Sequence, residues 1–108
     1  MAFRQEKIDS FLKGAAASFI ERRIGANSGA IISVIKIKTS KDLRKAKIFV
    51  SIFPEDKEKE ILPLLRKNLS DLRDCVKSQS KMKFLPFFEI KIDKSEKSRQ
   101  KIEKLLNE

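Results

Sequence analysis

The chain has 108 residues, of which 41% are hydrophobic and 37% charged, and we expect a single globular domain over residues 1–108. It has no histidine and one cysteine, Cys75, which excludes a histidine triad, a multi-cysteine zinc site and an internal disulfide. No apolar stretch is long enough to span a membrane and no apolar signal core follows Met1, so we expect a cytosolic protein with no membrane partner.

Residues 4–24 predict an amphipathic first helix, because apolar side chains recur there at steps of three and four. The predicted apolar face consists of Ile8, Phe11, Leu12, Ala15, Ala16, Phe19 and Ile20. Gly25 predicts the end of this helix, because glycine is common just beyond the last helical turn.

Two β-strands are predicted next, over residues 30–38 and 46–53. In the second strand the side chains alternate between an apolar face and a mixed face that contains Lys47, Phe49, Ser51 and Phe53. Only a short polar segment separates the two strands, so they are expected to pair as an antiparallel hairpin.

Helical spacing returns over residues 55–79. Pro63 lacks a backbone N–H, so we expect either a helix start near residue 61 or a kink at the proline. A second break is expected at Asn68-Leu69-Ser70, because asparagine and serine side chains compete for backbone hydrogen bonds.

A third strand is predicted over residues 85–92 and a last helix over roughly 95–106, capped by Ser95. The helical stretch before the third strand is long enough for a crossover, which predicts that this strand runs parallel to the second. The expected fold is therefore α+β, a three-stranded sheet with helices packed on one face.

The net charge of +10 favours a polyanionic partner, either a nucleic acid or an anionic membrane surface. Two segments hold most of the excess: residues 36–47 have six cations against one aspartate, and residues 66–83 have six against two. Lysines that only keep a small protein soluble would explain a high total charge, but they explain two concentrated segments less well.

The element order α-β-β-α-kink-α-β with a C-terminal helix is that of a type II KH-like domain. The hairpin, with its Ser40-Lys41-Asp42-Leu43 turn followed by Ala46-Lys47, resembles that of the ribosome-binding factor A family. A second part of the chain also resembles the family: Arg73 is followed by a basic stretch, Pro86, a strand and Asp93. The resemblance extends from about residue 4 to residue 106.

This resemblance implies an assembly factor that binds the free or immature small (30S) ribosomal subunit and assists late maturation of 16S rRNA, including its 5′ end. It also implies a role in cold adaptation and no enzymatic activity. The expected partner is the small subunit with its rRNA, and the expected state is a monomer without cofactor, metal or small-molecule substrate. The family usually has small residues between its two central helices, where this chain has Asn68-Leu69-Ser70.

The predicted RNA contacts fall into two groups, one on the hairpin and one around the second basic segment. Arg73 and Lys77 are four residues apart and share one helical face, and a helix N-terminus after Ser70 would add N–H groups for a phosphate. The predicted residues are Lys41, Arg44, Lys45, Lys67, Asn68, Ser70, Arg73, Lys77, Lys81 and Lys83. An intramolecular ion pair for Arg73, and simple solvation for the hairpin cations, remain open.

Two other functions are compatible with the same residues. A generic KH-like RNA-binding module would bind unrelated RNAs, and a basic protein-interaction adaptor would bind a protein partner independently of salt. The chain contains no tryptophan or tyrosine, which favours recognition of RNA shape and phosphate over stacking of individual bases. An enzyme is least favoured, because the aspartates are scattered and no nucleophile–base pair is visible.

Overall fold

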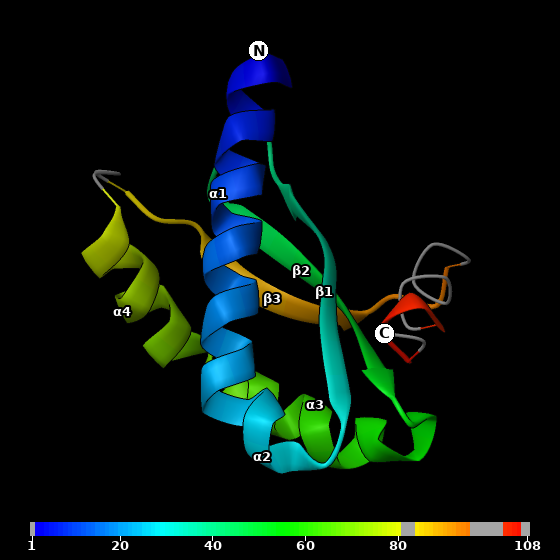
Figure 1. Cartoon of the computed structure of the whole chain (residues 1–108). Coiled ribbons are helices and arrows are strands. Elements are labelled where there is room, and N and C mark those ends of the chain that lie inside the picture. Colours follow the sequence, from blue (N-terminus) through cyan, green and yellow to red (C-terminus); the bar gives the residue numbers. More distant parts are fainter. Residues whose placement is uncertain (1, 81–83, 96–102, 107–108) are drawn as a thin grey trace.

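The computed structural model describes residues 2–80, 84–95 and 103–106 (Figure 1). Its elements are α1 (Ala2–Ile20), a π-helical turn (Glu21–Gly25), α2 (Ala26–Ser28), β1 (Ile31–Thr39), β2 (Lys45–Phe53), a 3-10 turn (Glu55–Lys57), α3 (Glu58–Lys67), α4 (Leu69–Gln79) and β3 (Phe87–Ile92).

The first helix packs its apolar face against β1, as predicted, with Leu12, Ala16 and Phe19 all buried. Phe11 is an exception, because 38% of its surface remains exposed. The prediction that Gly25 ends the helix is wrong. Gly25 has helical backbone angles, and the chain instead turns at Gly29, whose φ of 71° is the left-handed conformation that glycine adopts readily.

The sheet has the strand order β1-β2-β3. β1 and β2 pair antiparallel, and β2 and β3 pair parallel, so both predicted pairings are confirmed. A bulge at Ile35 shifts the register between Val34 and Lys36. On the central strand the alternation is complete: Ala46, Ile48, Val50 and Ile52 are buried beneath the helices.

The predicted helix start near residue 61 is wrong, because α3 begins at Glu58 and continues through Pro63. Pro63 and Lys59 both lie on the exposed side, so water can hydrate the carbonyl group that loses its N–H partner. Ile61 and Leu65, on the opposite side, are buried in the core and hold the helix in place. The second predicted break is confirmed, because α3 ends at Lys67 and α4 begins at Leu69.

β3 begins one residue after Pro86 and buries Phe88 and Ile90 beside β2. Of the predicted last helix, residues 96–102 lie outside the described residues, and so does its predicted start after Ser95. Residues 103–106 are helical, with Leu105 and Leu106 partly exposed.

One core joins α1, α3 and α4 to a single face of the sheet (Figure 1). Its most deeply buried large side chains include Leu12 from α1, Ile48 from β2, Ile61 from α3 and Leu72 from α4. The predicted α+β, type II KH-like arrangement is confirmed, and it leaves the opposite sheet face without a helix layer from these three helices.

Candidate nucleic-acid interface

The hairpin turn is held by side chains that the sequence motif supplies. The Ser40 hydroxyl donates a 2.6 Å hydrogen bond to the Asp42 carboxylate, which also accepts the Arg44 backbone N–H at 3.1 Å. The Lys45 N–H donates to the Ser40 hydroxyl at 3.1 Å, and Leu43 has a φ of 60°. These bonds lower the pKa of Asp42, first through Ser40 and then through the Arg44 N–H. A fixed turn therefore presents exposed Lys41, Arg44 and Lys45 to solvent.

This turn lies directly beside the start of β3. The Phe87 N–H donates a 2.8 Å hydrogen bond to the Arg44 carbonyl, and Lys45 is the register partner of Phe87. The fold thus brings the first basic segment against the residues that follow the second one. Sequence reasoning treated the hairpin and the second segment as separate patches.

The Arg73 side chain also lies beside the start of β3, but its guanidinium already binds groups of the protein. It donates hydrogen bonds to the carbonyls of Leu85 at 3.1 Å and Pro86 at 3.4 Å, and it lies 4.9 Å from the centre of the Phe87 ring. Among the described residues no acidic side chain forms an ion pair with Arg73, which differs from the ion pair considered from sequence. Arg73 is half-buried and positions the segment that leads into β3.

Lys77 is exposed one helical turn further along α4. It lies in the last turn of α4. Lys81 and Lys83, which were predicted to continue this track, lie outside the described residues.

The α3–α4 junction lies at the opposite end of α4 from Lys77. Asn68 is the only residue between the two helices, and its side-chain amide donates a 2.8 Å hydrogen bond to the Leu64 carbonyl at the end of α3. Lys67 and Ser70 flank it and are exposed. The nine helical steps from Asn68 to Lys77, at about 1.5 Å each, place about 14 Å of helix between this junction and Lys77.

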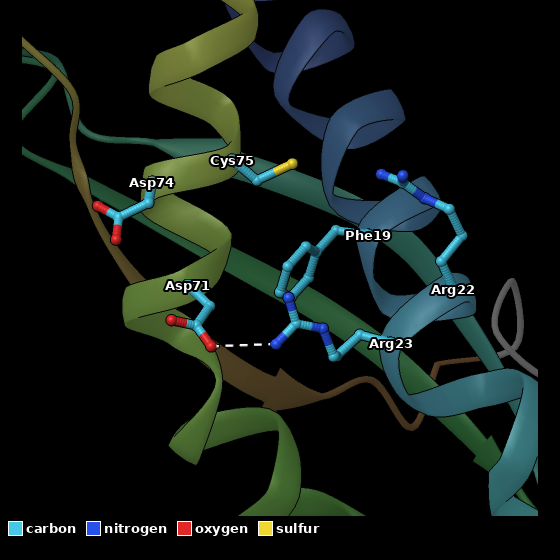
Figure 2. A pocket seen from close by; sticks show the side chains of 6 residues that line it. All are labelled: Phe19, Arg22, Arg23, Asp71, Asp74 and Cys75. Atoms are coloured by element: carbon cyan, nitrogen blue, oxygen red, sulfur yellow. Dashed lines mark hydrogen bonds and ion pairs between the residues drawn. The ribbon is translucent and has the colours of Figure 1, made fainter.

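The first turn of α4 is less suited to a phosphate than the sequence indicated. The helix begins at Leu69, ahead of Ser70 and not after it. Its first turn contains Asp71, whose carboxylate competes with any phosphate for the positive end of the helix. Figure 2 shows Asp71 facing Arg23 of the π-helical turn, with which it forms a 3.1 Å ion pair.

The hollow between α1 and α4 in Figure 2 has a volume of about 470 Å³ and mixes charges of both signs. Arg22 and Arg23 line it together with Asp71 and Asp74, so its charges largely compensate one another. Cys75 is half-buried here, and its sulfur accepts a 3.3 Å hydrogen bond from the Gln79 amide.

A second groove, of about 660 Å³, separates α3 from β3. Since β3 is the last strand of the sheet, one of its edges is unpaired by any described strand. The groove has a mainly apolar lining with three charged side chains, Arg66, Glu89 and Lys91.

Sequence reasoning did not assign the cations on the sheet face that points away from the helices. The strand registers place Lys36, Lys38, Lys47 and Lys91 on this face, and all four are exposed. The alternation of each strand already contained this signal, because residues two apart point to the same side. Within the described chain, no acidic side chain forms an ion pair with any of the four.

Two further findings concern metal ligands and membrane-spanning helices. Among the described residues, no group of three or more histidine, cysteine, aspartate and glutamate side chains is arranged to hold a metal ion. No helix in that part of the chain is both long and apolar enough to cross a membrane.

Residues 4–106 match the family model described as Ribosome-binding factor A. The chain belongs to the ribosome-binding factor A family. It is 35% identical over 95 residues to ribosome-binding factor A of Clostridium acetobutylicum, which covers 86% of this chain and 78% of that protein. It is 28% identical over 108 residues to that of Thermomicrobium roseum, covering 99% and 84%.

The solved structures agree on the fold of this ribosome-binding factor A family member. The crystal structure of ribosome-binding factor A from Thermus thermophilus has a TM-score of 0.72 at 23% identity, and covers 82% of this chain and 93% of that one. The family is one of ribosome-binding assembly factors, and the resemblance first seen in the hairpin and around Arg73 is confirmed over almost the whole chain.

Proposed function

We propose that the chain binds the free or immature small ribosomal subunit and assists late maturation of 16S rRNA, including its 5′ end, with its largest effect in the cold. Membership of the ribosome-binding factor A family over residues 4–106 is the observation that carries this proposal. We further propose that it acts in the cytosol as a single-domain monomer, and that it contributes binding energy alone, without an enzymatic step or a cofactor.

The hairpin cations support an rRNA target. Lys41, Arg44 and Lys45 are exposed on a turn whose backbone is already fixed, so little backbone order has to be created on binding. The ion pair of Arg44 with Asp42 spans 3.8 Å between exposed groups and is therefore weak. These cations are available to neutralise phosphates, which supply much of the affinity of RNA-binding proteins.

Co-sedimentation with purified small subunits, large subunits and whole ribosomes across a salt series tests the proposal. We expect pelleting with free small subunits only, weakening as salt rises. Equal pelleting with every particle would reduce the function to a generic RNA-binding module. Absence of pelleting at low salt would overturn RNA binding and favour the protein-interaction adaptor.

A charge-matched pair of variants locates the contact. Lys41→Ala combined with Lys45→Ala should weaken small-subunit binding by about tenfold or more and make it less dependent on salt, since two phosphate contacts are lost. The control combines Lys59→Ala with Lys104→Ala, which removes the same charge from exposed positions outside the hairpin. Equal loss in both variants would show that only the total charge matters.

A further inference from the structure

The sheet face opposite the helices combines cations and aromatic rings in register. One row across the three strands reads Lys36, Phe49 and Lys91, and the next reads Lys38, Lys47 and Glu89. The third row pairs Lys45 with Phe87. Neighbouring strands lie about 4.8 Å apart, so these side chains form one continuous surface.

The charge of this surface is strongly one-sided. Its lysines are exposed, and Glu89 is the only acidic residue in the three rows. The Lys36 ammonium lies 4.8 Å from the centre of the Phe49 ring, which holds that cation over the sheet. A surface with five lysines and one glutamate is complementary to a polyanion.

Phe87 adds an aromatic platform to the basic surface. Its side chain is 67% exposed, although large apolar side chains usually avoid water. Arg73 packs against the ring and is itself anchored by the carbonyls of Leu85 and Pro86. The ring is therefore held in one orientation in the free protein and needs little ordering before a base can stack on it.

We propose that this outer sheet face binds a single-stranded segment of RNA, with phosphates on Lys36, Lys38, Lys47 and Lys91 and an unpaired base stacked on Phe87. Open sheets that carry exposed aromatic rings among cations suit unpaired RNA, because the bases of a duplex are already stacked on one another. A protein partner would not require a surface so rich in lysine, a residue that is depleted in protein–protein interfaces. The proposal deepens the proposed function, because it rests on an RNA target.

Binding of a short fluorescein-labelled oligouridylate and of a blunt RNA duplex of equal length tests the proposal. Phe87→Leu keeps an apolar side chain but removes the stacking surface, so it should weaken single-strand binding by about five- to a hundredfold and leave duplex binding unchanged. Phe87→Trp should preserve binding. It also introduces the only tryptophan of the chain, whose fluorescence should be quenched by the single strand and not by the duplex.

The cations are tested with Lys38→Ala combined with Lys47→Ala, against the Lys59→Ala and Lys104→Ala control. The first pair should weaken oligouridylate binding by about tenfold or more and reduce the salt slope by about 1.4, at about 0.7 per lost contact on a single strand. Wild-type affinity in Phe87→Leu, an unquenched tryptophan, or equal loss in the control pair would each overturn the proposal.

Two outcomes separate this proposal from the function on which it rests. If single-strand binding depends on Phe87 but no variant or wild-type chain pellets with small subunits, the small-subunit function fails and the RNA site stands. If the wild-type chain pellets with small subunits but Phe87→Leu and the Lys38/Lys47 pair bind oligouridylate as wild type does, the sheet-face site fails and the function stands.

Discussion

The two faces of β2 are made by alternate residues of the same nine-residue strand, yet they serve different purposes. Ala46, Ile48 and Val50 point into the core and are fully buried, while Lys45 before them and Lys47 between them are exposed. Core burial fixes the register, because a slip of one residue would bury the lysines. The polar face can therefore be altered with little effect on the fold, and stability and binding should separate by face.

The largest expected effect is on the core face. Ile48→Ala removes a side chain with 0% exposure from the central strand and should lower the free energy of unfolding by about 2–5 kcal/mol. Its neighbour Lys47→Ala should change that free energy by less than about 0.5 kcal/mol while weakening RNA binding. Urea unfolding and oligouridylate binding measure the two effects. A large stability loss in Lys47→Ala would contradict the separation by face.

Arg73 and Lys77 of α4 also differ in whether they should affect stability or binding. Both were predicted to contact phosphates, but only Arg73 has its hydrogen bonds satisfied within the protein. Arg73→Met should lower the free energy of unfolding by about 1–3 kcal/mol, because it leaves two carbonyls without their charged donor. Lys77→Met should leave stability within about 0.5 kcal/mol and reduce only small-subunit binding.

Thermal unfolding of both variants, with co-sedimentation of the folded protein, distinguishes the two roles. Arg73→Met should also weaken binding of the single strand, because the Phe87 ring loses its support. An Arg73→Met variant with wild-type stability and weakened RNA binding would instead make Arg73 a direct RNA ligand.

Substitution of Asn68 should also lower stability without weakening binding, but by a smaller amount. Its amide closes the end of α3 by donating to the Leu64 carbonyl, so Asn68→Ala should lower the free energy of unfolding by about 0.5–1.5 kcal/mol. Small-subunit binding by the folded protein should remain within about twofold of wild type. Ser70→Ala, beside it on the exposed surface, is the matched control and should be close to neutral in stability. A binding loss confined to Asn68→Ala would contradict the structural role.

Periodicity predicted the elements well because burial alone decides which side of a helix or strand faces the core. The end of the first helix was missed because the π-helical turn accommodates Gly25, and local propensity contains no signal for that. The role of Arg73 depends on carbonyls twelve and thirteen residues away, which the charge pattern cannot reveal. The outer-face lysines, in contrast, follow the strand period and were accessible from sequence.

The smallest expected effect concerns the hairpin turn that displays the cations. The pKa of Asp42 lies below its ordinary value of 3.8, mainly because the Ser40 hydroxyl donates to its charged form. A depressed pKa in the folded state contributes stability that is present above that ordinary value and is lost as the pH falls through the folded pKa. Ser40→Ala should raise the pKa of Asp42 toward 3.8, as a carboxylate titration followed by NMR would measure.

The same variant links the turn to binding. With the Ser40 hydroxyl absent, Lys45 loses the acceptor of its backbone N–H, so the turn should become less ordered. Lys41, Arg44 and Lys45 would then have to be ordered on binding, and small-subunit affinity should fall by a few-fold without any change in net charge. Unchanged affinity in Ser40→Ala would show that the charge of the hairpin suffices and that its fixed geometry contributes nothing to binding.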